Sequence, residues 1–275
     1  FGPAGFAEEA LYPCYGLAES TLFVAGMWAG AGVGGSWISR AALENGGVKP
    51  AEPGAADAIE VPSCGHVAPG HRVVIADPDT GQPADRDTVG EVWVAGPSVA
   101  SGYWRRPQES GEVFGTRLRG GDEPFLRTGD LGFLRAGQIY LTGRRKDLMV
   151  VHGRNIYPTD VEDVAQAVAD CLRPGCGASF LTGDDSTDMV IVQETTEDDE
   201  TQLRKLAVAI RQAVLERLNV AVADVVLIRP RTMAKTSSGK LRRRACRDDY
   251  LAGSLDTVFR LRAATPSLAS ARDLT

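Results

Sequence analysis

The sequence predicts a mixed α/β (α+β) fold in two parts, a mostly β part followed by a smaller αβ part. Short apolar runs bounded by turn residues occupy residues 72–76, 91–95 and 131–141, and such runs are typical of strands. After Asp147 the pattern changes, because helical and strand signals then alternate as far as residue 228. The chain has 275 residues, of which 43% are hydrophobic, and this is sufficient for one large or two ordinary domains.

The strands of the first part are marked by the turns that follow them. Residues 72–76 lead into a turn at residues 77–81 that contains both Pro and Gly. Residues 91–95 are predicted to form a half-buried strand ending at Gly96. Residues 131–134 and 139–141 are expected to pair as a hairpin.

A glycine-rich segment at residues 30–35 imitates a dinucleotide-binding fingerprint. It has no clear strand before it and no clear helix after it, so a surface loop is the favoured interpretation.

The second part begins with a helix that Thr159 is expected to cap and that runs to about Leu172. Strands are predicted near residues 177–183 and 188–194. Helical spacing follows an acidic run, at positions Leu203, Leu206, Ala207, Ile210, Val214, Leu215 and Leu218. A buried strand is predicted at residues 225–228.

Composition excludes several functional classes. The net charge of −6 argues against nucleic acid as the main partner. The five cysteines form no C-x-x-C pair and are interpreted as reduced thiols of a cytoplasmic protein. No apolar run is long enough to span a membrane.

The segment KTSSGK at residues 235–240, followed by three arginines at 242–244, is the most informative motif. Small hydroxyl residues and a glycine favour an exposed turn, which can carry Lys240 into a cleft where negative charge develops. A solvated basic loop is the alternative. The residue order differs from that of a P-loop.

Four further segments accompany this motif in a fixed order. Each alone is compatible with a turn or a salt-bridged corner. They are YGLAEST at residues 15–21, RTGDLG at 127–132, GRRKD at 143–147 and HGRNIYPTDVE at 152–162.

Together these motifs resemble the adenylate-forming superfamily of acyl-CoA ligases, luciferases and adenylation domains of peptide synthetases. The match is closest to fatty acyl-AMP ligases, on residues 14–22 and 235–247. The resemblance implies the end of a large domain at residues 1–143, a hinge at 144–147, a small mobile domain at 148–260 and a tail at 261–275. Residues 36–62 are the candidate for a family-specific insertion.

The resemblance also implies ATP and Mg²⁺ as cofactors. Tyr15 would lie against the adenine, with Gly16 beside it, and Asp130 would accept hydrogen bonds from the ribose hydroxyls. Arg144 would contact the ribose or phosphate side, and Glu19 would bind Mg²⁺. The alternatives are a core tyrosine, a turn aspartate, a surface-paired arginine and a surface carboxylate.

Three residues are assigned to movement and catalysis by the same resemblance. Lys240 would bridge the substrate carboxylate and the α-phosphate. Lys146 occupies the hinge position, about which the small domain rotates in related enzymes. After that rotation the loop at Gly153 would serve attack by a thiol.

The implied substrate is a medium- or long-chain fatty acid, and the implied partner is an acyl carrier protein with its phosphopantetheine arm. The first motif begins at residue 15, and no phosphate loop precedes it. The chain is therefore expected to be the C-terminal portion of a longer enzyme. An acyl-CoA ligase and a non-catalytic fragment that docks a carrier protein are the alternatives. Ala18 replaces a common threonine, as in fatty acyl-AMP ligases, and Ala234 replaces the usual proline.

Overall fold

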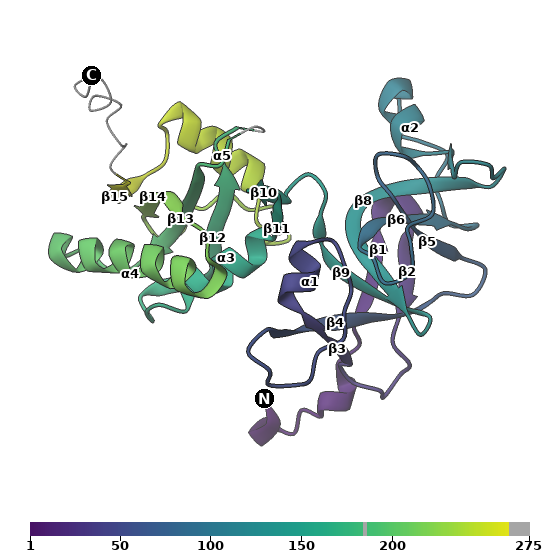
Figure 1. Ribbon diagram of the computed structural model, residues 1–275, viewed down its shortest axis with the longest axis horizontal. Coiled ribbons are helices and arrows are strands. Elements are labelled where there is room, and N and C mark those ends of the chain that lie inside the picture. Colours follow the sequence, from purple (N-terminus) through teal and green to yellow (C-terminus); the bar gives the residue numbers. More distant parts are fainter. Residues whose placement is uncertain (184–185, 264–275) are drawn as a thin grey trace, which may run out of the picture. The chain divides into compact units, whose positions relative to one another are not determined.

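The computed structural model describes residues 1–183 and 186–263, which form two compact units (Figure 1). The first unit is Phe1–Leu148 and the second is Met149–Thr275. The mixed α/β class predicted from the sequence is confirmed. The finer assignment of the units to a large and a small domain stays a prediction.

The first unit consists mainly of strands. Its elements are η1 (Gly2–Ala4), η2 (Glu8–Ala10), β1 (Cys14–Leu17), η3 (Ala18–Ser20), β2 (Leu22–Gly26), β3 (Gly35–Ser39), α1 (Arg40–Glu44), β4 (Ala58–Val67), β5 (Arg72–Ala76), β6 (Gly90–Ala95), α2 (Pro107–Val113), β7 (Thr116–Arg117), β8 (Pro124–Arg135) and β9 (Gln138–Arg144). The main sheet has the order β1-β2-β4-β9-β8-β6-β5, with β3 paired to β4 and β7 paired to β8.

The hairpin predicted at residues 131–141 is confirmed as β8 and β9, which pair antiparallel around the turn at Ala136 and Gly137. The half-buried strand predicted at residues 91–95 is wrong, because every residue of β6 is buried. Val92 and Val94 pack into one cluster, whereas Trp93 packs with Phe125 in another. Both faces of β6 are therefore covered.

Secondary structure also fills the candidate insertion at residues 36–62, where the sequence analysis predicted none. β3 pairs antiparallel with β4, and Trp37 lies opposite Glu60. Ser39 caps α1, since its side chain accepts a hydrogen bond from the backbone N–H of Ala42.

The second unit is an αβ layer structure with a small hairpin. Its elements are β10 (Met149–Val151), β11 (Arg154–Ile156), α3 (Pro158–Gln166), β12 (Leu172–Leu181), β13 (Met189–Thr195), α4 (Glu200–Leu218), β14 (Val222–Ile228), α5 (Arg243–Ala252) and β15 (Thr257–Arg262). The sheet order is β12-β13-β14-β15, in which β13 and β14 run parallel and the other neighbours antiparallel.

Alternation along the central strands divides the core of this unit between two faces. Ile191 and Leu227 pack with Ile210 of α4 on one face. Val190 and Val226 pack on the other face, in the cluster that includes Cys246 of α5. Figure 1 shows α4 and α5 on opposite sides of the sheet. Central strands that are buried on both faces typically have nearly continuous apolar sequences.

Two predicted boundaries in this unit are wrong. The helix predicted from Thr159 to Leu172 begins at Pro158 and ends at Gln166, and no side-chain cap holds its first turn. Proline is suited to the first helical position because its missing N–H would have no partner there. Leu172 instead starts β12 and is buried in the core. The predicted tail begins too early, because β15 extends to Arg262, and its residues 264–275 lie outside the described residues.

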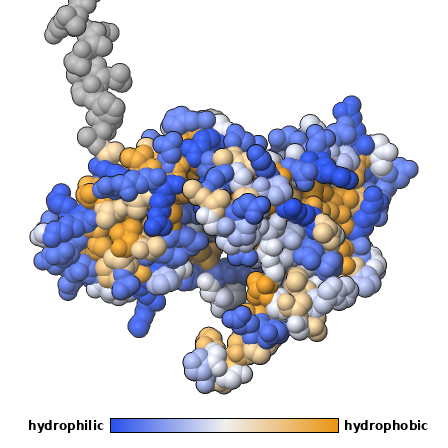
Figure 2. Space-filling view, turned by 60° about the horizontal axis from the view of Figure 1, so that its bottom comes forward, coloured by the Kyte–Doolittle hydropathy of each residue, from blue (hydrophilic) through white to orange (hydrophobic). Residues whose placement is uncertain are grey.

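The surface in Figure 2 is largely hydrophilic, with patches of hydrophobic residues between the polar stretches. Large side chains that are mostly exposed in the first unit include Leu22, Trp28 and Trp104. Among the described residues, no helix is long and apolar enough to cross a membrane.

Gly16 allows β1 and β2 to approach each other closely. The register of the pair shifts between Tyr15 and Gly16. A Cβ atom at residue 16 would lie 1.6 Å from the carbonyl oxygen of Leu22. Any side chain at Gly16 would therefore force the two strands apart.

We expect Gly16→Ala to destabilise the first unit by about 2 kcal/mol or more, because the methyl group has no space beside the backbone. The matched control is Gly111→Ala in α2, where nothing lies within 4 Å of the added Cβ. This control should be neutral or stabilise by about 0.5 kcal/mol. Denaturation followed by tryptophan fluorescence reports on the first unit, since Trp28, Trp37, Trp93 and Trp104 all lie there. Equal midpoints for the two variants would contradict the close approach.

Candidate functional site

Three of the residues predicted to bind a nucleotide lie together in the first unit. The Tyr15 hydroxyl in β1 donates to Oδ2 of Asp130 in β8 at 2.7 Å. Nε of Arg144, at the end of β9, donates to Oδ1 of the same carboxylate at 3.1 Å. Asp130 is buried within a strand, so the alternative of a turn aspartate is wrong. The sheet order β1-β2-β4-β9-β8 brings these distant segments together.

The electrostatics of this cluster keep the Tyr15 phenol in its protonated form. Burial, followed by the nearby Asp130 carboxylate, raises the pKa of the Tyr15 phenol well above its ordinary value. Tyr15 therefore stays protonated and acts as a donor. Each carboxylate oxygen has two lone pairs, so Asp130 can accept further hydrogen bonds while both neighbours remain in place. The Arg144 side chain is 69% exposed and can contact a ligand.

The burial of Tyr15 bears on its predicted contact with adenine. Only 6% of the residue is exposed, and the ring packs with Val24 and Val92 in the core. Its polar contact is with Asp130. The geometry gives Tyr15 a direct hold on the carboxylate, and a stacking contact stays a prediction.

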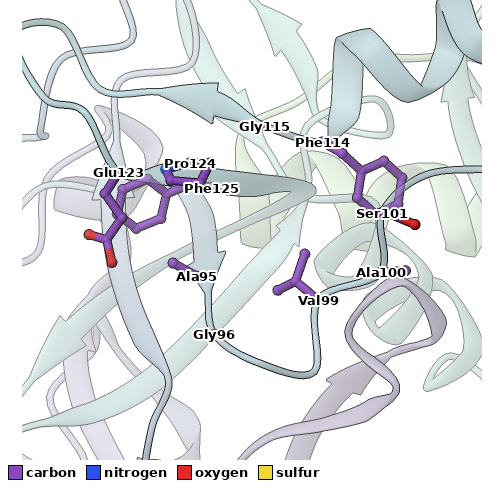
Figure 3. Close-up of a pocket in the computed structure, with 10 residues that line it drawn as sticks. All are labelled: Ala95, Gly96, Val99, Ala100, Ser101, Phe114, Gly115, Glu123, Pro124 and Phe125. Atoms are coloured by element: carbon purple, nitrogen blue, oxygen red, sulfur yellow. The ribbon is translucent and has the colours of Figure 1, made fainter.

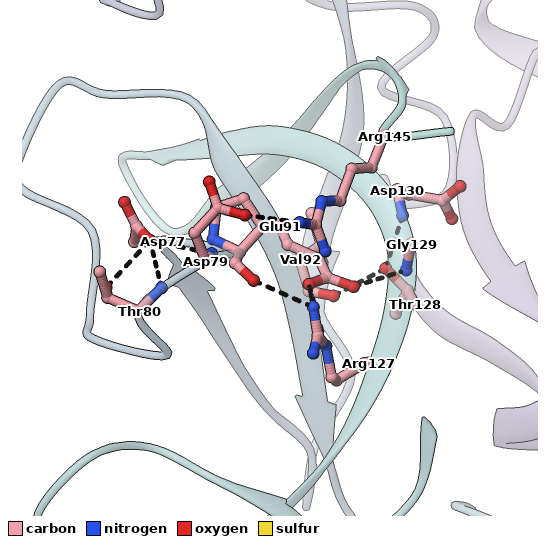
Figure 4. Close-up of polar contacts among 11 residues, drawn as sticks. Asp77, Asp79, Thr80, Glu91, Val92, Arg127, Thr128, Gly129, Asp130 and Arg145 are labelled. Atoms are coloured by element: carbon pink, nitrogen blue, oxygen red, sulfur yellow. Dashed lines mark hydrogen bonds and ion pairs between the residues drawn. The ribbon is translucent and has the colours of Figure 1, made fainter. Parts of the chain in front are cut away.

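A polar network that the sequence analysis did not single out holds the backbone before Asp130 (Figure 4). Glu91, which is buried in β6, accepts from the Arg127 guanidinium at 2.7 Å and from the Gly129 N–H at 3.1 Å. The Thr128 hydroxyl donates to the Val92 carbonyl at 2.7 Å. The sequence signal that could have identified Glu91 is a charged residue at the start of an otherwise apolar predicted strand. These bonds fix the approach of β8 to the site.

Glu19, the predicted metal ligand, lies on the short helix η3 that follows β1. Its carboxylate accepts a hydrogen bond from the Tyr103 hydroxyl at 2.7 Å. Its backbone carbonyl accepts from the Ala100 N–H at 2.8 Å. Burial, followed by the contact with Glu19, raises the pKa of Tyr103 to about 12. Tyr103 is a second residue that the sequence analysis missed.

The Glu19 carboxylate is suited to be one ligand of a magnesium ion whose other ligands come mainly from a nucleotide. Within residues 1–183 and 186–263, no group of three or more His, Cys, Asp or Glu side chains is placed to hold a metal. Mg²⁺ commonly takes one or two protein carboxylates, with phosphate oxygens and water supplying its other positions. A single partly exposed carboxylate is consistent with that mode.

A pocket of about 420 Å³ lies in the first unit, beside the segment that contacts Glu19 (Figure 3). Figure 3 shows Val99 between Phe114 and Phe125, with Glu123 at one end. Its lining is mostly apolar, and none of the predicted site residues contributes to it. Nucleotide binding at the Asp130 cluster stays a prediction, and this pocket is separate from the residues predicted for it.

The remaining predicted residues lie on exposed turns. Lys146 follows β9, in a turn where the Arg145 N–H donates to the Gly129 carbonyl. Gly153 and His152 form the turn between β10 and β11, and both have positive φ angles. No atom lies within 4 Å of a Cβ built on Gly153, so that position is open.

The segment at residues 234–242, called here the Lys240 loop, is a closed hairpin-like turn. The Thr236 N–H donates to the Lys240 carbonyl at 2.8 Å, and the Lys240 N–H donates to the Thr236 hydroxyl at 3.0 Å. The Arg242 N–H donates to the Ala234 carbonyl at 2.9 Å. The Lys240 side chain is exposed, and within the described residues no hydrogen bond or ion pair holds its ammonium group.

The arginines after this loop differ from one another. Arg242 and Arg244 are exposed, but Arg243 makes a bidentate ion pair with Glu162, which is 8% exposed. Arg243 is thus a structural residue.

Two family models match parts of this chain. Residues 4–104 match the family model for AMP-binding enzymes, and residues 146–259 match the model for the AMP domain of Disco-interacting protein 2-like proteins.

Similar proteins include a medium-chain-fatty-acid–[acyl-carrier-protein] ligase from Moorena producens, 39% identical over 93% of this chain and 44% of the relative. A long-chain-fatty-acid–AMP ligase from Mycolicibacterium smegmatis is 33% identical over 93% of this chain and 46% of the relative. The chain thus spans a little under half the length of these relatives.

A solved structure from work on fatty acyl-adenylate ligases of E. coli and L. pneumophila aligns with a TM-score of 0.81. It is 29% identical, and the match covers 92% of this chain and 44% of that chain. The chain is therefore similar over most of its length to fatty acyl-AMP ligases, and its residues 4–104 match the AMP-binding enzyme family.

Proposed function

We propose that this chain is the C-terminal part of a fatty acyl-AMP ligase. The enzyme would join a medium- or long-chain fatty acid to AMP and then pass the acyl group to a carrier-protein thiol. The observation that carries the proposal is the buried Asp130 carboxylate, held between Tyr15 and Arg144, in a chain related to fatty-acid–AMP ligases.

Asp130 would bind the ribose of ATP. Its carboxylate oxygens would accept hydrogen bonds from both ribose hydroxyls, and such bonds would fix the orientation of the ribose. Arg144 would contact the ribose or phosphate side, because its guanidinium is mostly exposed beside Asp130. Gly16 would contribute by letting β1 carry Tyr15 close to β2.

Glu19 would hold Mg²⁺ together with the phosphates. The bound ion would neutralise phosphate charge that otherwise repels the incoming carboxylate. Tyr103 would orient Glu19 through the hydrogen bond to its carboxylate.

Lys240 would stabilise the transition state of adenylation. A carboxylate oxygen of the fatty acid attacks the α-phosphorus of ATP, the bond from that phosphorus to the β-phosphate oxygen breaks, and pyrophosphate leaves. The ammonium of Lys240 would bridge the attacking carboxylate and the α-phosphate, where negative charge is concentrated. Its exposure on a closed turn leaves it available for that contact.

The second half-reaction would use a different turn of the second unit, the one at Gly153. We infer that the chain pivots at Lys146, that Lys240 withdraws, and that the open turn at Gly153 takes its place. A phosphopantetheine thiol would then attack the acyl carbonyl and release AMP. An acyl carrier protein is supported as the thiol donor by the name of the Moorena relative.

The proposed function is tested by mass spectrometry of the products formed from ATP, Mg²⁺ and a C12 fatty acid, with either CoA or a phosphopantetheinylated carrier protein. The assay uses the full-length gene product that contains this chain. Acyl-AMP and acyl-carrier protein without acyl-CoA are expected. Acyl-CoA as the main product would make the enzyme an acyl-CoA ligase, and no activation at all would favour a non-catalytic docking role.

We expect Tyr15→Phe to raise the KM for ATP by about tenfold to a hundredfold, which corresponds to losing one hydrogen bond to a charged group. The aromatic ring remains, so stacking is preserved and only the hold on Asp130 is lost. Tyr140→Phe is the matched control, because its hydroxyl contacts Gln138 at 3.3 Å in the same sheet. A Tyr15→Phe enzyme with an unchanged KM would assign the role of Tyr15 to its ring.

We expect Lys240→Ala to lower the rate of acyl-AMP formation by about a hundredfold or more, as removal of one transition-state charge contact does. ATP affinity should change little, since the ammonium acts at the carboxylate and α-phosphate during attack. Rates and ATP dissociation constants are measured on the same preparations. Loss of affinity equal to the loss of rate would refute this role.

A further inference from the structure

We propose that two buried glutamates, Glu162 and Glu194, are positioning residues that clamp the two ends of the Lys240 loop. This inference rests on the proposed function for the role of Lys240. The clamp itself is a feature of the second unit alone. All of its contacts lie within α3, β12, β13, residues 231–242 and the start of α5.

Glu194 holds the incoming end of the loop. It lies near the end of β13 and is 1% exposed. Its Oε1 accepts from the Met233 N–H at 2.7 Å, and Met233 immediately precedes the loop. Its other oxygen is paired with Arg173 of β12. Although burial alone would raise the pKa of Glu194, backbone N–H groups of Arg231 and Met233 and the charge of Arg173 lower it below the ordinary value.

Glu162 holds the outgoing end. It lies in α3, and its two oxygens accept from Nε and a terminal nitrogen of Arg243 at 2.7 Å each. Arg243 immediately follows the loop. The Ser179 N–H in β12 donates to the same carboxylate at 3.0 Å. Glu162 is therefore fixed to the sheet as well as to α5.

The two anchors meet the loop at the residues that flank its closing hydrogen bond. Ala234 and Arg242 are joined by their backbone, one position inside Met233 and Arg243. Both carboxylates are on elements packed in the core, whereas residues 235–240 are exposed. Lys240 is thus presented from a turn with fixed ends, which lowers the entropy lost when its ammonium reaches the reacting groups.

Removing either negative charge would release one end of this turn. Glu162→Gln removes the charge that accepts the bidentate contact of Arg243, and Glu194→Gln removes the charge that accepts from the Met233 N–H, so the local segment rearranges. Misplacement of a reacting group by about 1 Å can cost up to a hundredfold in rate. We expect Glu162→Gln and Glu194→Gln to lower the kcat of acyl-AMP formation by about tenfold to a hundredfold. The KM for ATP should remain within about twofold, because the Asp130 cluster is intact.

A purely structural role and a positioning role differ in the second half-reaction. If the clamp positions Lys240, both variants should still transfer the acyl group from supplied acyl-AMP to carrier protein at the wild-type rate. A general loss of folding would lower both half-reactions together. Asp256→Asn is the matched control, because it breaks an exposed ion pair with Arg229 in the same unit and leaves the loop alone.

The experiment that tests the clamp independently of the activity is hydrogen exchange of the loop amides in this chain. Amides of residues 234–243 should exchange faster in both glutamate variants and at the wild-type rate in Asp256→Asn and Lys240→Ala. Arg243→Lys, which keeps the charge but loses the bidentate contact, should show a smaller increase and keeps the test valid if Glu162→Gln fails to fold. Unchanged exchange in all the clamp variants would overturn the proposal.

Exchange and activity together separate the possible failures. Faster exchange with unchanged acyl-AMP formation would overturn the positioning role. Faster exchange in a protein whose wild type forms no acyl-AMP would remove the proposed function, and with it the role of the clamp in catalysis. Faster exchange with a selective loss of kcat supports the whole inference.

Discussion

Buried carboxylates require partners, and this requirement organises both units of the protein. An ionised acid removed from water is tolerated only when hydrogen bonds and opposite charges replace its hydration. Glu91 and Asp130 meet this demand in the first unit, and Glu162 and Glu194 meet it in the second. Their partners come from distant segments, so each acid ties together parts of the chain that the sequence separates.

The segments tied in this way include those proposed to carry the chemistry. Glu91 bonds to the backbone of Gly129, directly before Asp130. Glu194 and Glu162 bond to residues on either side of the Lys240 loop. Lys240 and Gly153 lie on exposed turns and Arg144 at the end of β9, whereas Asp130 is buried within β8. Buried charged residues that fix the backbone, together with exposed charged residues that can bind a substrate, are expected when binding geometry must be preorganised.

The two units would contribute different groups to the proposed reaction. The first unit presents Asp130 from strand β8 and Glu19 from the short helix η3, and its sheet holds strands that are far apart in sequence side by side. The second unit, built on one four-stranded sheet, presents Gly153 from the turn between β10 and β11 and Lys240 from the loop between β14 and α5. In the proposed reaction, the first would bind the nucleotide throughout, while the second would supply different groups to successive steps.

The amino-acid sequence by itself determined the fold class, the hairpin at residues 131–141, the family and the identity of the candidate site residues, because motifs and local periodicity are written in neighbouring residues. It did not reveal that Asp130 is buried in a strand, that Glu91 and Tyr103 support the site, or that Arg243 pairs with Glu162. These contacts join residues between 36 and 84 positions apart. Only tertiary packing decides which charged side chains lose their water, and therefore which of them must pair.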